Sequence, residues 1–99
     1  MTVVILEDAA EDIELGEQFY ESREPGIGDY FIRSILSDLG SLVLYAGIHS
    51  VHFGFQRLLS KRFPFGIYYL VEDQTAYIYA VLDMRQDPLW LRRELKNRG

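Results

Sequence analysis

Apolar and polar positions in the first half of the chain predict a strand followed by two helices. The segment Thr2–Leu6 is short, apolar and β-branched, as expected of a strand. Apolar residues then recur every three or four positions on both sides of Pro25-Gly26, which indicates two amphipathic helices. The stripe of the first helix is Ala9, Ile13, Gly16 and Tyr20, and that of the second is Ile27, Phe31, Ile35, Leu39 and Leu42.

Local signals mark the ends of these helices. Asp8 precedes Glu11 by three residues, a spacing that can cap the first helical turn reciprocally. Pro25 disfavours helical geometry in the residue before it and so ends the first helix. Gly26 and Gly28 suit turn geometry, followed by a cap near Asp29. Two helices with so short a connection form an antiparallel hairpin.

The second half of the chain shows the two-residue alternation of β-strands. We expect strands over 51–60, 63–71 and 75–82, with an acidic turn at 72–74 between the last two. In the first, Phe53, Phe55, Arg57 and Leu59 share a face. The last strand is apolar on both faces and is therefore expected to be central. One face holds Tyr77, Tyr79, Val81 and Asp83, and the other holds Ala76, Ile78, Ala80 and Leu82.

A short closing helix is expected after Asp87-Pro88, where aspartate caps the helix and proline takes its first position. Leu91 and Leu95 would face inward, with Arg92, Arg93 and Lys96 outward. Four tyrosines of the strands, Tyr68, Tyr69, Tyr77 and Tyr79, are expected in the core and at its rim.

Length and composition indicate one domain over residues 1–99. The chain is 48% hydrophobic and 14% aromatic, which suffices for one core and argues against disorder. It has no cysteine, and His49 and His52 lack a third ligand, so we expect no metal and no cofactor. No signal peptide and no membrane-spanning apolar run are evident, so a cytoplasmic protein is expected.

Charge is distributed unevenly along the chain, which has a net charge of −5. The first fifty residues hold ten acids and two bases, whereas the remainder holds five acids and eight bases. This asymmetry suggests different partners for the two halves, although a solvated acidic helix would show the same run of charges. Proteins that grip nucleic-acid phosphates usually carry an overall basic charge, and this chain does not.

The stretch from Arg57 to Arg93 carries the most specific signal. It contains KRFPFGIYY from Lys61 to Tyr69 and VLDMRQDPLW from Val81 to Trp90. These runs resemble the KRFPY-x-I-Y-Y and V-x-H-x-R-R-D-P-x-x-W runs of the RelE/ParE toxin superfamily, the plasmid stabilisation proteins of bacterial type II toxin–antitoxin pairs. The run Gly26–Phe31 resembles the family's G-x-G-D-x-F start of the second helix.

The resemblance implies an α+β fold: an N-terminal strand and a helical hairpin packed on a three- or four-stranded antiparallel sheet, with a short C-terminal helix. It also implies a cognate antitoxin as partner, in a hetero-oligomer. ParE-like members bind and poison DNA gyrase, whereas RelE-like members cut messenger RNA on the ribosome without metal. The fold alone does not separate these two activities.

Site residues follow from the same resemblance. Arg57, Lys61 and Arg85 are the catalytic candidates for a RelE-type nuclease, since arginine can hold phosphate through two hydrogen bonds. The candidates for binding the target or the antitoxin are Arg57, Arg62, Asp83, Trp90, Arg92 and Arg93. Alternatively, the basic residues solvate the sheet margin or pair with Asp83, Asp87 and Glu94.

Asp83 departs from the family pattern, in which many members carry histidine. An aspartate titrates near ~3.9, so it is anionic at neutral pH and a poor acid for a leaving oxygen. It could also pair with Arg85 or Arg57 and neutralise a cation that a nuclease needs. We therefore expect a ParE-like gyrase inhibitor, with the RelE-type nuclease and a non-toxic, antitoxin-binding homologue as alternatives.

The antitoxin is expected to wrap the helical hairpin and the edge strand, as peptide partners of this kind occupy grooves or extend sheets. It would bury apolar rim residues such as Ile48, Val51 and Phe53.

Overall fold

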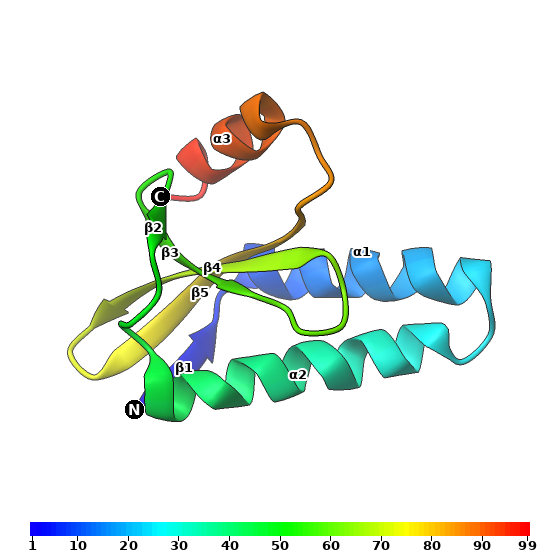
Figure 1. Ribbon diagram of the computed structural model, residues 1–99, viewed down its shortest axis with the longest axis horizontal. Coiled ribbons are helices and arrows are strands. Elements are labelled where there is room, and N and C mark those ends of the chain that lie inside the picture. Colours follow the sequence, from blue (N-terminus) through cyan, green and yellow to red (C-terminus); the bar gives the residue numbers. More distant parts are fainter.

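Three helices and five strands follow one another in the structure, a computed structural model that describes residues 1–99 (Figure 1). The first half comprises β1 (Thr2–Ile5), α1 (Glu7–Arg23) and α2 (Ile27–Tyr45). The second half comprises β2 (Val51–His52), β3 (Phe55–Leu59), β4 (Phe65–Glu72), β5 (Thr75–Asp83) and α3 (Pro88–Lys96). None of the helices has both the length and the apolar character that crossing a bilayer requires.

The strands form one sheet in the order β1-β5-β4-β3-β2. Neighbouring strands run antiparallel, except that β1 pairs with β5 in parallel, with Thr2 opposite Thr75. The predicted α+β class is confirmed, but the sheet has five strands and is mixed rather than purely antiparallel. β5 lies between β1 and β4, and its interior position agrees with the apolar residues on both of its faces.

Residues 51–60 form a tight hairpin, so the prediction of one continuous strand there was wrong. The turn residues Phe53 and Gly54 have φ angles of 56° and 88°. Two successive residues with positive φ form the two-residue turn whose twist matches that of the flanking strands. Consequently Val51 pairs with Gln56 and His52 with Phe55, and Phe53 lies at the exposed turn instead of sharing a face with Phe55.

A β-bulge at Tyr79 changes the alternation in β5. Tyr68 of β4 pairs with Ala80, but the next residue, Tyr69, pairs with Ile78. One extra residue in β5 reverses the side on which the following side chains point. Ile78 and Val81 therefore lie on the same face, and the predicted strict alternation from Ala76 to Asp83 was wrong beyond Tyr79.

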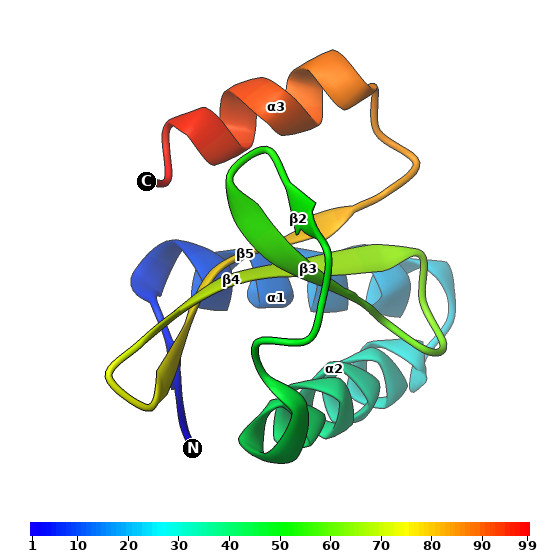
Figure 2. The ribbon, with the colours of Figure 1, turned by 60° about the vertical axis from the view of Figure 1, so that its left-hand side comes forward.

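The two faces of the sheet pack against different helices and form two cores (Figure 2). The larger core joins one face to the helical hairpin and includes Ile13, Phe31, Ile35, Leu42, Phe65, Ile67, Tyr69, Ile78 and Val81. The smaller core joins the other face to α3 and consists of Phe55, Tyr68, Ala80, Leu82, Leu91 and Leu95. The inward positions predicted for Leu91 and Leu95 and the interior positions predicted for Tyr68 and Tyr69 are confirmed.

The starts of α1 and α2 use different residues from those predicted, whereas Asp87 caps α3 as expected, by accepting the Leu89 backbone N–H at 2.8 Å. α1 begins after Leu6 without a side-chain cap, so Asp8 and Glu11 form no capping box. The Glu21 carboxylate of α1 instead accepts hydrogen bonds from the backbone N–H groups of Gly26 and Gly28, at 3.1 and 3.0 Å, and caps α2 in place of Asp29. A carboxylate at this end of α2 also complements the helix dipole.

Gly26 and Gly28 have different roles. Gly26 has φ +93° and forms the predicted turn, whereas Gly28 is buried within α2. A Cβ on Gly28 would lie 2.9 Å from the Glu17 carbonyl oxygen and 2.8 Å from the Glu21 Cβ of α1. The turn role predicted for Gly28 was therefore wrong, because this glycine allows the two helices to approach closely.

Gly28→Ala should lower the free energy of unfolding by about 1–3 kcal/mol, because the α1 backbone that blocks the added methyl group cannot move away cheaply. Gly40→Ala is the matched control in the same helix, since a Cβ there meets nothing within 4 Å. It should raise stability by about 0.5–1 kcal/mol through helix propensity. Urea unfolding measures both. Equal stability of the two variants would contradict the proposed role of Gly28.

An ion pair between Asp12 of α1 and Arg98, just after α3, completes the edge of β5 beyond the end of β1. The Asp12 carboxylate accepts the backbone N–H of Val81 at 2.9 Å. Arg98 donates to both oxygens of Asp12, at 2.7 and 3.0 Å, and to the Tyr79 carbonyl oxygen at 2.9 Å. Both side chains are only 10% exposed. The hydrogen bonds that Arg98 donates to Asp12 are the main cause that raises the pKa of Arg98.

Arg98→Met should lower the free energy of unfolding by about 3 kcal/mol, because it leaves a largely buried carboxylate without its counter-charge. The control is Arg93→Met in α3, whose side chain is exposed and makes no ion pair. Chemical denaturation followed by the fluorescence of Trp90 measures both changes. A loss no greater than that of the control would show that the pair does not hold α3 to the domain.

Candidate functional site

Arg57 lies in β3 on the face of the sheet that α3 covers. It stands opposite Tyr68, which belongs to the smaller core. Gly66 makes room for it, since a Cβ there would lie 3.2 Å from the Arg57 Cδ and 2.7 Å from the Met84 Sδ. The Arg57 Nε is buried and has no hydrogen-bond partner. Arg57 thus keeps an unused donor.

Tyr68 shares this environment with Arg57. Its hydroxyl donates a hydrogen bond to the Met84 Sδ at 3.1 Å. Burial raises the pKa of Tyr68, and the hydrogen bond with Arg57 opposes this shift only in part. The phenol therefore stays protonated at neutral pH.

Asp83 and Arg85 form an ion pair on the other face of the sheet. Asp83 stands opposite Phe65, which belongs to the larger core under the helical hairpin. The Arg85 Nε donates to Asp83 Oδ1 at 3.0 Å, and Nη2 donates to Oδ2 at 2.7 Å. The backbone N–H of Arg85 also donates a hydrogen bond to Asp83 Oδ1, at 2.9 Å. Of the two partners considered for Asp83, the structure selects Arg85.

The pair stabilises both charges. Hydrogen bonding by the Arg85 guanidinium lowers the pKa of Asp83, and the opposing effect of burial is smaller. The same hydrogen bonds raise the pKa of Arg85, with a small contribution from Tyr20 of α1. Asp83 is therefore ionised at neutral pH and has no proton to donate.

The structure does not bring the three nuclease candidates together. Arg57 and the Asp83–Arg85 pair lie on opposite faces of the sheet, as the strand register requires. Lys61 is exposed in the loop between β3 and β4. Arg85, moreover, is already held by a carboxylate, so Arg57 is the candidate with a free donor in a buried setting.

The other basic candidates for binding lie apart from one another. Arg62 is exposed in the loop before β4 and lines a shallow hollow with Tyr30, Arg33 and Ser34. Arg92 and Arg93 are exposed on α3, on the outward side predicted for them.

Asp83 and Trp90 do come together, in a groove between α1 and the segment that joins β5 to α3. The groove has a volume of about 240 Å³. Its lining includes Leu15, Gly16 and Phe19 of α1, Phe65 of β4, Val81 to Asp83 of β5, and Gln86 and Trp90. Leu15 and Phe19 are 56% and 43% exposed although they are large and apolar. We call this hollow the α1 groove.

A second apolar surface surrounds β2. Ile48 is 74% exposed and Val51 is 65% exposed, and Leu44, Tyr45 and Phe53 beside them in the chain are exposed as well. Figure 1 shows that the end of α2, the following loop and the β2–β3 hairpin lie at one end of the molecule. We call these residues the β2 patch.

His49 and Tyr69 hold the loop that carries part of this patch. The Tyr69 hydroxyl accepts the Gly47 backbone N–H at 3.1 Å, donates to the Gln56 side-chain oxygen at 3.1 Å and is hydrogen-bonded to His49 Nδ1. Burial lowers the pKa of His49, so its ring is neutral at pH 7. No local pattern in the sequence indicates this contact, because the two residues come from a loop and from a distant strand.

Comparisons with known proteins add evidence on the fold. No protein-family model matches the chain, and no curated protein sequence matches it. A solved structure described as "Chromosomal ParDE TA system from P. aeruginosa" has a chain similar to this one, with a TM-score of 0.77. The similarity covers 86% of this chain and 97% of that chain at 20% sequence identity. The two chains share a fold. The RelE/ParE-like architecture expected from residues 57–93 is thereby confirmed.

The Asp83–Arg85 pair predicts a pH-dependent contribution to stability. The folded-state pKa of Asp83 lies below its unfolded value, so the contribution is complete above the unfolded pKa, ~3.9, and is lost as pH falls through the folded value. Asp83→Asn should therefore destabilise the protein by about 1 kcal/mol at pH 7. The difference from the wild type should vanish in strong acid.

Urea unfolding at several pH values measures this dependence. Glu72→Gln is the control, because Glu72 is exposed and makes no ion pair. A difference between Asp83→Asn and the wild type that stays constant from pH 7 to strong acid would contradict the role of the ionised pair.

Proposed function

We propose that this chain is the toxin of a bacterial type II toxin–antitoxin pair and acts in the cytoplasm by binding DNA gyrase, as ParE-like proteins do. A cognate antitoxin would neutralise it in a hetero-oligomer. The resemblance of residues 57–93 to the RelE/ParE superfamily and the shared fold with a chain of a ParDE system support the toxin class.

The Asp83–Arg85 ion pair is the observation that favours binding over RNA cleavage. Cleavage at a ribose 2′-hydroxyl needs a group that takes its proton, an acid for the leaving oxygen and cations that stabilise the phosphate. Asp83 is anionic and would repel a phosphate, and it already holds the Arg85 guanidinium by three side-chain hydrogen bonds. A phosphate would have to displace this carboxylate to reach Arg85.

The β2 patch supports a function that depends on protein partners. The chain from Leu39 to Gln56 contains Asp, Glu, Lys or Arg at no position, and much of its apolar surface is exposed. Large apolar side chains left exposed on a short edge strand and on the loop before it, as Val51 and Ile48 are, indicate an interaction site. β2 is also a short edge strand, to which an extended segment of the antitoxin can add. We therefore place part of the antitoxin contact at Ile48, Val51 and Phe53.

One observation keeps the RelE-type nuclease as the second candidate. The Arg57 Nε is buried and has no hydrogen-bond partner, as expected of a residue that binds an anion. In that case Arg57, Lys61 and Arg85 would have to come together around the phosphate from the separate positions that they occupy here, and replacing the three by alanine would abolish RNA cutting. The third candidate, a homologue that binds antitoxin without being toxic, retains the same patch.

Inducible expression in bacteria without antitoxin tests these candidates. Growth, messenger RNA integrity and plasmid supercoiling are followed together. We expect growth arrest with intact RNA and with relaxed or cleaved plasmid, because gyrase is the proposed target. Rapid RNA decay would replace the proposal by the nuclease, and unchanged growth would replace it by the non-toxic homologue.

Ile48→Ser combined with Val51→Ser gives an internal control for the antitoxin contact. The wild type and this variant are each co-expressed with the product of the neighbouring gene. Both side chains are mostly exposed, so the variant should fold and remain toxic. Rescue of growth should be weaker for the variant, and equal rescue would place the antitoxin contact elsewhere.

A further inference from the structure

The α1 groove has apolar walls that the fold itself does not use. Leu15 and Phe19 of α1 are largely exposed beside it, whereas Phe65, Val81 and Leu82 form a buried base. Exposed large apolar residues next to a concave apolar surface indicate a binding groove. At about 240 Å³ the groove is smaller than the sites that take free small molecules, which begin near ~300 Å³. It suits one large side chain that protrudes from a protein partner.

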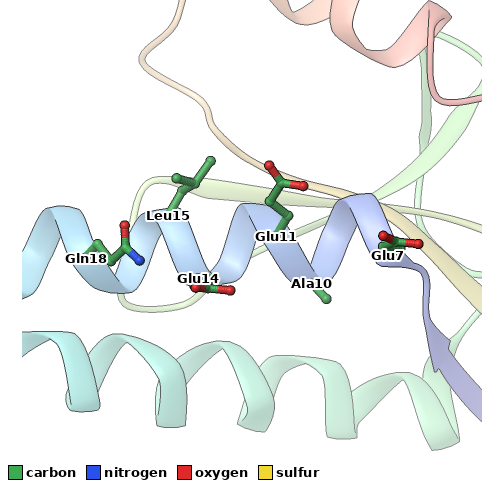
Figure 3. A pocket seen from close by; sticks show the side chains of 6 residues that line it. All are labelled: Glu7, Ala10, Glu11, Glu14, Leu15 and Gln18. Atoms are coloured by element: carbon green, nitrogen blue, oxygen red, sulfur yellow. The ribbon is translucent and has the colours of Figure 1, made fainter.

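The helix α1, which forms one wall of the groove, is strongly acidic. Two charged groups that line the groove are neutralised internally, since Asp12 pairs with Arg98 and Asp83 pairs with Arg85. Glu7, Glu11, Glu14 and Glu17 of α1 do not line the groove, but they make no ion pair and leave the helix with uncompensated negative charge. Figure 3 shows Glu11 on the same side of α1 as Leu15, whereas Glu14 points from the other side of the helix. The single base of α1, Arg23, lies over the Phe19 ring at 4.6 Å, at the far end.

We propose that the α1 groove receives a large apolar side chain of the antitoxin, and that the antitoxin segment around this side chain is rich in lysine and arginine. The inference rests on the proposed toxin function and adds the chemistry of the partner. Complementary charge steers association and selects against wrong partners. The acidic helix also disfavours nucleic acid as the occupant, because its phosphates would meet the like charge of α1.

The antitoxin is the favoured protein occupant because of where the groove lies. The molecule measures 39 × 30 × 21 Å. An extended segment of about ten residues spans such a distance, at ~3.3 Å per residue. One antitoxin chain can therefore occupy the β2 patch and continue across the helical hairpin to the α1 groove. A contact surface of this length agrees with an antitoxin segment that wraps around the toxin and so neutralises it.

A random peptide library displayed on phage tests the chemistry of the partner. The full chain is immobilised, and peptides that bind it are sequenced. We expect enriched peptides with a net positive charge and one or more large apolar residues. Neutral or acidic enriched peptides would overturn the inference, and so would equal enrichment on the Leu15→Ser variant.

The fluorescence of Trp90 shows whether the peptides bind at the groove. Trp90 is the only tryptophan of the chain and lines this groove, so a tryptophan-free enriched peptide should change its emission. Glu11→Gln with Glu14→Gln should weaken binding about fivefold, since each exposed charge pair contributes ~0.5 kcal/mol. Leu15→Ser should weaken it by about tenfold through lost apolar contact.

Two matched variants control for net charge and for apolar surface. Glu72→Gln with Asp73→Asn removes the same charge at the β4–β5 turn, and Leu44→Ser removes a leucine that is 79% exposed on α2. Both should leave peptide affinity unchanged. If they weaken binding as much as the groove variants do, the groove is not the site.

The peptide experiments can fail while the proposed toxin function holds, and the reverse is also possible. Growth arrest by the wild type together with acidic or neutral enriched peptides would leave the toxin function in place and overturn the partner chemistry. If basic peptides bind the groove but expression of the chain does not arrest growth, the partner chemistry stands and the toxin function is overturned. Displacement of a bound peptide by purified gyrase, but not by the product of the neighbouring gene, would overturn the assignment of the antitoxin as occupant.

Discussion

The contact on which the rest of the structure depends is the one that Asp12 and Arg98 make with the edge of β5. β1 pairs with β5 only as far as Ile78, so the backbone groups of Tyr79 and Val81 would face an open edge. A carboxylate from α1 and a guanidinium from the chain end satisfy them in place of a longer β1. Since buried backbone groups left without partners destabilise a fold, this pair fixes α1, β5 and α3 to one another.

This arrangement also determines which side chains can act together. The bulge at Tyr79 lies beside the ion pair and reverses the alternation of β5, so Val81 and Asp83 point toward the helical hairpin. Arg57 points toward α3. The sheet therefore separates Arg57 from the Asp83–Arg85 pair. The cations that a phosphate would need lie on its two opposite faces. The geometry favours recognition of proteins over cleavage of RNA.

Two surfaces are available for such recognition, and they differ in character. The β2 patch is apolar and uncharged along the chain, and the α1 groove is an apolar hollow beside an acidic helix. A partner that covers both must combine apolar anchors with positive charge. The asymmetry of charge between the two halves of the sequence therefore has a structural counterpart, because most of the uncompensated acids lie on α1 beside an apolar hollow.

The sequence by itself determined the class of fold and most of its elements. Apolar periodicity located both long helices, the turn at Pro25-Gly26, the β4–β5 hairpin and the inward leucines of α3, because each of these patterns is local. The motifs between Lys61 and Trp90 indicated the RelE/ParE-like architecture, and Asp83 was identified as the residue that departs from it.

Tertiary structure decided what depends on contacts between distant segments. The parallel pairing of β1 with β5, the Asp12–Arg98 pair and the Tyr69–His49 contact each join residues far apart in the chain. Pairing across the sheet decided that Asp83 holds Arg85 and not Arg57, which alternation in single strands left open. The bulge at Tyr79 and the hairpin turn at Phe53-Gly54 were not predicted from the sequence. One extra residue, or one turn with positive φ, reverses the side on which every following side chain points. Only the pairing with the neighbouring strand shows where this occurs.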